Sequence, residues 1–188
     1  MLLEYVPREV NDPTIQSLFE RDAAIYGQPS LFARALAHNP TVLDARLEYV
    51  ASLTGSGGLD DRLAELIYAS VAQAKQCEYC IDSHTNRLVE GFDLDEETIE
   101  AIEDRDDETL AGDLSERESS VISFVTAMAT DPKRVSDRDI DRLREHGFGD
   151  DGLIALVVTA SAAIAATVIA DTLNIHPQDA ATLDDIER

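Results

Sequence analysis

Apolar residues recur along the chain at helical spacing, and the alternation typical of strands is scarce. Side chains three and four residues apart share one face of an α-helix. Such a face runs along the segment 60–75 and consists of Leu63, Leu66, Ile67, Ser70, Val71 and Ala74. The pattern of apolar and polar positions therefore predicts an all-α protein.

Start and stop signals divide the chain into helices. Asp12-Pro13 and Asn39-Pro40 are typical starts, and Ser115 with Glu118 forms a capping-box pattern. The predicted helices cover approximately residues 13–26, 29–37, 40–53, 60–75, 78–90, 95–105, 116–129 and 136–146. Gly91 and Gly147 are the expected stops of two of them. The glycine-rich run 54–58 lacks the Lys-Ser/Thr of a phosphate-binding loop, so we interpret it as a turn or hinge.

The segment from Leu153 to Ala170 contains eighteen residues without a charge, which is the length at which a membrane span becomes a candidate. Seven of the eighteen are alanine, and the flanking residues are acidic with no adjacent basic anchor. We therefore expect a buried helix, at the centre of a bundle or at a subunit interface, rather than a membrane helix.

Length and charge narrow the function classes. A chain of 188 residues fits a single domain over 1–188, and its net charge of −23 argues against binding nucleic acid or an anionic membrane. Only two basic residues are lysines, Lys75 and Lys133, and an acidic, lysine-poor surface suggests adaptation to high salt, as in halophilic proteins. The first ten residues have no apolar signal segment, so we expect a cytoplasmic protein.

The chemistry is concentrated between residues 65 and 84. Both cysteines of the chain, Cys77 and Cys80, form a C-x-x-C motif, with His84 four residues further on and Glu65 twelve residues before the first cysteine. A helix from Cys77 onward would place the cysteines and His84 on one stripe. The positive end of that helix favours the thiolate form. The motif thus predicts a thiol pair that cycles between dithiol and disulfide, with His84 and Glu65 available to move a proton.

Other interpretations of this motif remain open. Two thiolates, an imidazole and a carboxylate also form an acceptable zinc ligand set. Structural zinc sites usually draw on two separated ligand pairs, and this chain has no second cysteine pair, so we favour redox chemistry. The β-α-β context of thioredoxin-like motifs is absent from the predicted elements. Tyr68, near Glu65, is more typical of a core residue than of a catalytic one.

The spacing Glu65-x11-Cys77-x2-Cys80-x3-His84 resembles the AhpD-like alkylhydroperoxidase branch of the carboxymuconolactone decarboxylase family, most specifically over residues 35–92. The resemblance implies an all-α fold, assembly into trimers or hexamers, and a thiol peroxidase activity without a cofactor. It also implies that Cys80 attacks the hydroperoxide, that Cys77 resolves the product to a disulfide, and that His84 and Glu65 form the proton relay.

The resemblance further implies a dithiol reductant, such as a lipoylated protein. The chain departs from the best-known members at Tyr79, where those proteins have a second histidine; a phenol titrates near pH 10 and cannot replace an imidazole as a base, although Tyr79 can support the site with a hydrogen bond. Two alternatives are a lactone decarboxylase, whose family members generally lack the cysteine pair, and a non-enzymatic redox-sensing or zinc-binding protein.

Overall fold

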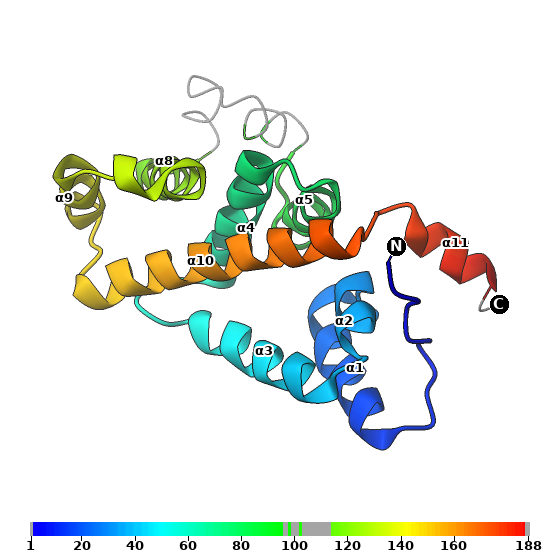
Figure 1. Cartoon of the computed structure of the whole chain (residues 1–188). Coiled ribbons are helices and arrows are strands. Elements are labelled where there is room, and N and C mark those ends of the chain that lie inside the picture. The colour runs from blue at the N-terminus through cyan, green and yellow to red at the C-terminus, as the bar shows by residue number, and fades with distance from the viewer. Residues whose placement is uncertain (1, 96–97, 99–101, 103–113, 187–188) are drawn as a thin grey trace. The chain divides into compact units, whose positions relative to one another are not determined.

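The computed structural model describes residues 2–95, 98, 102 and 114–186, and all the regular elements in these ranges are helices, which confirms the all-α prediction (Figure 1). In chain order the elements are α1 (Pro13–Tyr26), α2 (Leu31–Leu36), α3 (Pro40–Leu53), α4 (Asp61–Lys75), α5 (Glu78–Phe92), α8 (Glu116–Thr130), η1 (Pro132–Arg134), α9 (Asp137–Glu145), α10 (Asp150–Leu173) and α11 (Asp179–Ile186).

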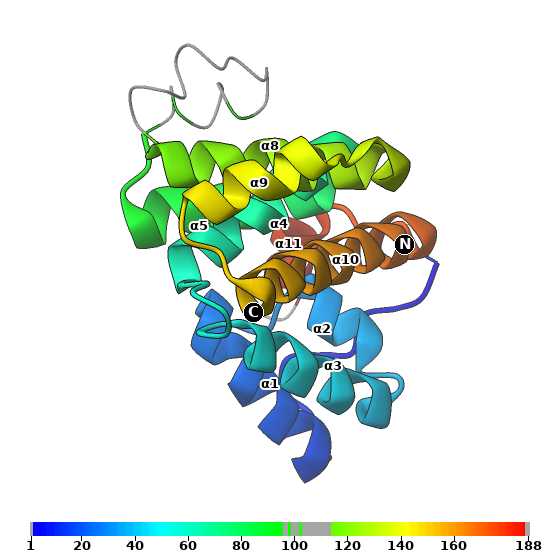
Figure 2. The same cartoon turned by 90° about the vertical axis from the view of Figure 1, so that its left-hand side faces the viewer.

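The chain divides into two compact units. The first contains Met1–Ser52 and Ile169–Arg188, and the second contains Leu53–Val168. Leu18, Phe19 and Leu43 are at the centre of a small core in the first unit. The second unit has a larger core around α4, which packs against both α5 and α8, and α9 lies beside α8 (Figure 2). The prediction of a single domain over 1–188 stays a prediction.

Local capping chemistry sets most of the helix ends as the sequence predicts. Asp12 accepts a hydrogen bond from the backbone N–H of Thr14 at 2.8 Å and caps α1. The capping box of α8 is complete: Ser115 Oγ accepts from the Glu118 N–H at 3.2 Å, and Glu118 Oε2 accepts from the Ser115 N–H at 2.9 Å. These bonds satisfy backbone donors that a helix start leaves unpaired.

The prediction of Gly91 as the stop of α5 is wrong. The helix continues through Gly91 to Phe92, and Asp93 takes the left-handed conformation with φ 55°. Continuing the helix allows Phe92 to pack against the core of the second unit, and aspartate is one of the few residues besides glycine that tolerates this conformation. The helix predicted over 95–105 lies mostly outside the described residues, although Asp95 Oδ1 accepts the Thr98 N–H at 2.8 Å, as an N-cap does.

The glycine-rich run 54–58 forms a turn that packs closely on the first turn of α10. Gly57 has φ 57°, and a Cβ atom there would lie 2.7 Å from the Cα atom of Gly152. Only a residue without a side chain fits at this approach. Gly57 therefore has a packing role, which agrees with the missing phosphate-binding signature.

Helix α10 is buried along one face, so the prediction of a buried helix holds for that face alone. Ala155, Leu156 and Ala160 are buried, whereas Ile154 and Val168 are 64% and 54% exposed. Among the described residues, α10 is the one helix long and apolar enough to cross a membrane, and half of its most apolar window is buried inside the fold. Core helices of soluble proteins pass the same test, so this is weak evidence for a membrane span.

Candidate active site

The candidate site lies between α4 and α5, which are joined by a two-residue connection and pack against each other (Figure 1). Gln76 takes the left-handed conformation, and its N–H bonds to the last turn of α4, which ends the helix. Cys77 then begins the return. The connection joins the C-terminal end of α4 to the N-terminal end of α5, and Glu65 contacts His84 across the two helices. The two helices therefore run antiparallel. This arrangement brings all four predicted catalytic residues into one structural unit.

The two cysteines occupy different positions relative to α5. Cys77 is the N-cap, with an extended backbone of φ −86° and ψ 100°, so it lies outside the helix rather than on the predicted stripe. Cys80 lies in the first turn, one turn before His84, and shares its helix face. Neither cysteine is part of a disulfide, and both side chains are buried. Cys80 thus lies near the N-terminal end of α5, where the helix dipole carries partial positive charge.

His84 and Glu65 form a buried hydrogen-bonded pair. The His84 Nδ1 atom lies 2.8 Å from Glu65 Oε2, and both side chains are about nine-tenths buried. An ionised carboxylate can only accept, so the proton on this ring edge belongs to Nδ1. The Nε2 atom is then the ring nitrogen that can exchange a proton with a neighbouring thiol. The structure thus brings together the imidazole and carboxylate that the sequence predicts.

Arg87 is a member of this cluster that sequence reasoning missed. Its Nε atom lies 2.9 Å from Glu65 Oε1, the oxygen that does not face His84. Burial by itself would raise the pKa of the Glu65 carboxyl, but the His84 ring and the Arg87 guanidinium outweigh it and lower that pKa below its usual value. The available signal was the spacing: Arg87 follows His84 by three residues and so shares its helix face.

Tyr68 is the second contributor that sequence reasoning did not assign to the site. Its ring stacks on the His84 ring, with centroids 4.8 Å apart and an interplanar angle of 29°. Tyr68 follows Glu65 by three residues on α4, so the same helix face presents the carboxylate and the ring. The expectation that Tyr68 is a core residue is correct in burial, but the residue also fixes the plane of the imidazole.

Tyr79 lies in the first turn of α5 and is half-buried. Its supporting role stays a prediction. Within the described ranges, no group of three or more His, Cys, Asp or Glu side chains is arranged to hold a metal ion. The Nδ1 atom of His84 bonds Glu65.

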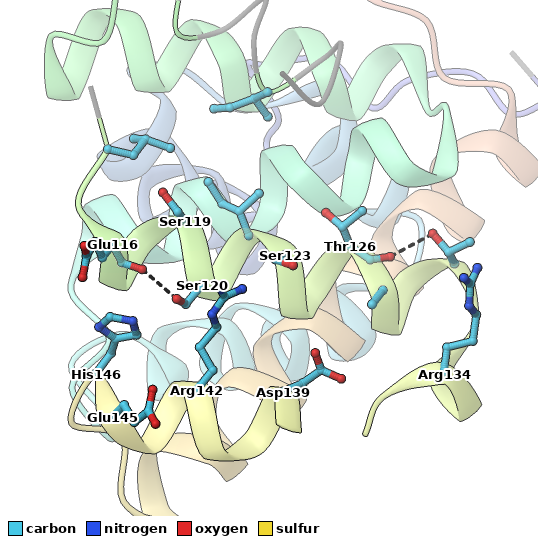
Figure 3. A pocket seen from close by; sticks show the side chains of 15 residues that line it. Glu116, Ser119, Ser120, Ser123, Thr126, Arg134, Asp139, Arg142, Glu145 and His146 are labelled. Atoms are coloured by element: carbon cyan, nitrogen blue, oxygen red, sulfur yellow. Dashed lines mark hydrogen bonds between the residues drawn. The ribbon is translucent and has the colours of Figure 1, made fainter. Parts of the chain in front are cut away.

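A cleft of about 940 Å³ lies between α8 and α9, apart from the cysteines (Figure 3). Helix α8 lines it with hydroxyl groups, and α9 lines it with charged groups of both signs. The hydroxyls of Ser120 and Thr130 bond to carbonyl oxygens of their own helix. None of the residues that line the cleft belongs to the thiol cluster, so the cleft offers no link to redox chemistry.

Comparison with known proteins points to one family. Residues 40–107 match the family model described as the carboxymuconolactone decarboxylase family. This match includes α4 and α5 and hence the whole thiol cluster. Among curated proteins, none matches this sequence.

Solved structures share the fold over nearly the whole chain. One is an alkylhydroperoxidase AhpD core protein from Ralstonia eutropha JMP134, described as an uncharacterized peroxidase-related protein (TM-score 0.75, 20% identity, 93% of this chain and 94% of that chain covered). Another is an uncharacterized peroxidase-related protein from Silicibacter sp. TM1040 (TM-score 0.77, 20% identity, 92% and 89% covered). A third is the debrominase Bmp8 in complex with 2,3,4-tribromopyrrole (TM-score 0.77, 16% identity, 100% and 99% covered). Together, the comparisons show that the chain has an AhpD-like fold and that residues 40–107 resemble the carboxymuconolactone decarboxylase family.

Proposed function

We propose that this protein is a thiol-dependent peroxidase that reduces hydroperoxides through Cys77 and Cys80. Its family and its structural neighbours are enzyme-like, which supports an enzyme. The observation that carries the proposal is the buried pair of His84, which lies on the helix whose first turn holds Cys80, and Glu65 of α4. A thiol near an imidazole that is oriented by a carboxylate is the usual arrangement for an activated sulfur nucleophile.

In the proposed reaction these groups act one after another. His84 removes the proton of Cys80, and the thiolate attacks the outer oxygen of the hydroperoxide, whose O–O bond breaks. The proton passes from His84 to the leaving alkoxide, which departs as an alcohol, and Cys80 becomes a sulfenic acid. The Cys77 thiol then attacks the Cys80 sulfur, forming the disulfide and releasing water. Two electrons and two protons from an external dithiol restore both thiols.

The reductant, the assembly and the location belong to the same proposal. A dithiol such as a lipoylated protein can reduce the Cys77–Cys80 disulfide by exchange, with no bound cofactor. We propose a homo-oligomer, a trimer or hexamer, working in the cytoplasm, where the reducing conditions favour the dithiol form. Tyr79 cannot act as a base near neutral pH, so proton transfer depends on His84 alone, and we expect slower turnover than in relatives with a second histidine.

A thiol titration tests the proposal. One equivalent of hydroperoxide is expected to remove both thiols per chain, and a small dithiol is expected to restore them. The Cys80→Ser variant should lose turnover by about 10³-fold or more, since the nucleophile is gone. The Cys77→Ser variant is the matched control: it should accumulate one sulfenic acid per chain, which dimedone traps. Stoichiometric zinc with inert thiols, or normal turnover of Cys80→Ser, would contradict the proposal.

The alternatives are tested with the same protein. A lactone decarboxylase would act on its lactone with both cysteines replaced by serine, because its chemistry does not use them. The debrominase neighbour was solved in complex with 2,3,4-tribromopyrrole, so this compound is a third candidate to test. Thiol loss with the tribromopyrrole and none with hydroperoxides would move the proposal to a thiol-dependent dehalogenase, whereas the reverse supports the peroxidase.

A further inference from the structure

The site is built from two pairs of side chains, each pair three residues apart on one helix. Helix α4 supplies Glu65 and Tyr68, and α5 supplies His84 and Arg87. The two helices face each other so that Tyr68 stacks on the His84 ring and Glu65 lies between the imidazole and the guanidinium. Each carboxylate oxygen of Glu65 contacts a different side chain: Oε2 contacts His84 and Oε1 contacts Arg87.

The division of the two oxygens constrains the carboxylate. A carboxylate held by one partner can rotate about its terminal bond and change which oxygen it offers. A hydrogen-bond contact of 2.8 Å on one oxygen and an ion-pair contact of 2.9 Å on the other restrict that rotation. The Arg87 guanidinium also supplies a permanent positive charge, since it stays protonated at all physiological pH values, whereas the His84 ring changes its charge when it moves a proton.

We propose that Arg87 is a positioning residue of the thiol site: it fixes the Glu65 carboxylate in the charge state and rotation that hold His84 ready to take the proton of Cys80. The inference rests on the proposed function, because it assigns a role in the same relay. The lowered pKa of Glu65, to which Arg87 contributes, agrees with it. In this role Arg87 acts through Glu65.

A purely structural role gives a different expectation. A guanidinium that only balances a buried carboxylate would stabilise the fold without affecting the reactivity of Cys80. The pair Arg62–Glu118 offers a matched comparison in the same unit: the Arg62 Nε atom lies 2.8 Å from Glu118 Oε1, between α4 and α8. Burial by itself would raise the pKa of Glu118. The hydrogen bond and charge of Arg62 and the hydrogen bonds of Ser115 outweigh it and lower that pKa. Arg62 contacts Glu118 and the Phe92 carbonyl oxygen, so this pair serves as the control for the structural effect of a partly buried ion pair.

The test measures how fast iodoacetamide alkylates Cys80 as a function of pH, in full-length protein carrying Cys77→Ser so that one thiol reports. Arg87→Gln is expected to lower the rate at neutral pH about tenfold and to shift the pH profile, and Arg87→Lys is expected to recover part of the loss. In a Glu65→Gln background the same Arg87→Gln change should alter the rate by less than about twofold, because the group it acts through is gone.

The controls separate the outcomes. Arg62→Gln is expected to lower the unfolding temperature and leave the pH profile unchanged. The proposal is overturned if Arg87→Gln lowers the unfolding temperature alone, or if it slows alkylation equally with Glu65 and with Gln at position 65. The alkylation assay uses no peroxide, so it does not depend on the proposed peroxidase activity. If that activity is absent, the wild-type protein will not consume hydroperoxide. The coupling between Arg87 and Glu65 can still be measured by alkylation.

Discussion

Two buried carboxylates in the molecule have pKa values shifted in opposite directions. Glu65, in the second unit, lies between His84 and Arg87, and its pKa is lowered. Asp22, in the first unit, is 4% exposed and accepts the backbone N–H of Ser30 at 2.6 Å, just before α2. Burial raises the pKa of Asp22, and the hydrogen bonds to Ser30 and the charge of Arg46 oppose this without offsetting it.

The difference shows what keeps a buried acid ionised. Both groups lose water, which penalises the charged form. Neighbouring side chains able to carry positive charge overcome that penalty for Glu65, whereas a backbone N–H and a weaker charge do not overcome it for Asp22. Asp22 therefore orders the start of α2, a structural task, while Glu65 remains a permanent charge beside an imidazole, which is the requirement of a proton relay.

The largest expected effect is on peroxide turnover, which should depend on Glu65 and not on Asp22. Glu65→Gln should lower peroxide turnover by about 100-fold, because an amide neither orients His84 Nδ1–H as well nor stabilises the positive ring. Asp22→Asn should leave turnover within about twofold of wild type, since Asp22 belongs to a separate unit and to no catalytic group. Steady-state peroxide consumption measures both. Equal losses in the two variants would mean that burial, rather than pairing, explains the effect.

A second prediction concerns stability against pH. Because the pKa of Glu65 is lowered in the folded state, Glu65 contributes fully to the free energy of unfolding at pH values above the ordinary glutamate pKa of about 4.3. This contribution is lost as the pH falls through the pKa of the folded state. The raised pKa of Asp22 has the opposite sign: stability rises as the pH falls through the folded value toward the ordinary aspartate value of about 3.9.

Urea unfolding of wild type and variants across this acidic range tests the two signs. As the pH is lowered, the free energy of unfolding of Asp22→Asn should fall relative to that of wild type. The free energy of unfolding of Glu65→Gln should instead rise relative to that of wild type. The difference between each variant and wild type cancels the many surface carboxylates that titrate in both. Parallel curves for the two variants would show that the two acids do not differ in the way proposed.

A smaller effect is expected from Tyr68. Replacing it by leucine removes the stacking on His84 and should reduce the free energy of unfolding by about 1 kcal/mol beyond the change in buried area, with slower alkylation of Cys80. Tyr68→Phe keeps the ring and is the matched control, expected to retain both properties. Alkylation of the leucine variant at the wild-type rate would show that stacking does not position the imidazole.

The smallest effect on the site is expected from a change in salt concentration. The net charge of −23 is spread over the surface, and dilute buffer should lower the unfolding temperature because self-repulsion is then unscreened. The Glu65–Arg87 pair is mostly buried and is screened much less, so the alkylation profile of the folded protein should stay the same. Circular dichroism at low and high salt measures the first effect; unchanged stability in dilute buffer would remove the hypothesis of salt adaptation.

Local signals predicted the helices well, because a cap acts through atoms a few residues away. The starts at Pro13 and Glu116 follow from Asp12 and from the Ser115–Glu118 box. The failures occur where distant packing competes with a local signal. Gly91 is a good stop by itself, yet α5 continues because Phe92 packs against the core. The uncharged run in α10 fits burial on all sides, but the neighbouring elements cover one face only.

The sequence by itself determined the helical class and the four residues Glu65, Cys77, Cys80 and His84, because helical spacing and a rare cysteine pair are visible in one dimension. Tertiary structure decided that Arg87 and Tyr68 join them, and that Cys77 caps α5 from outside the helix. The physical reason is that spacing fixes only the face on which a side chain lies. Which charges are desolvated together depends on how α4 packs against α5.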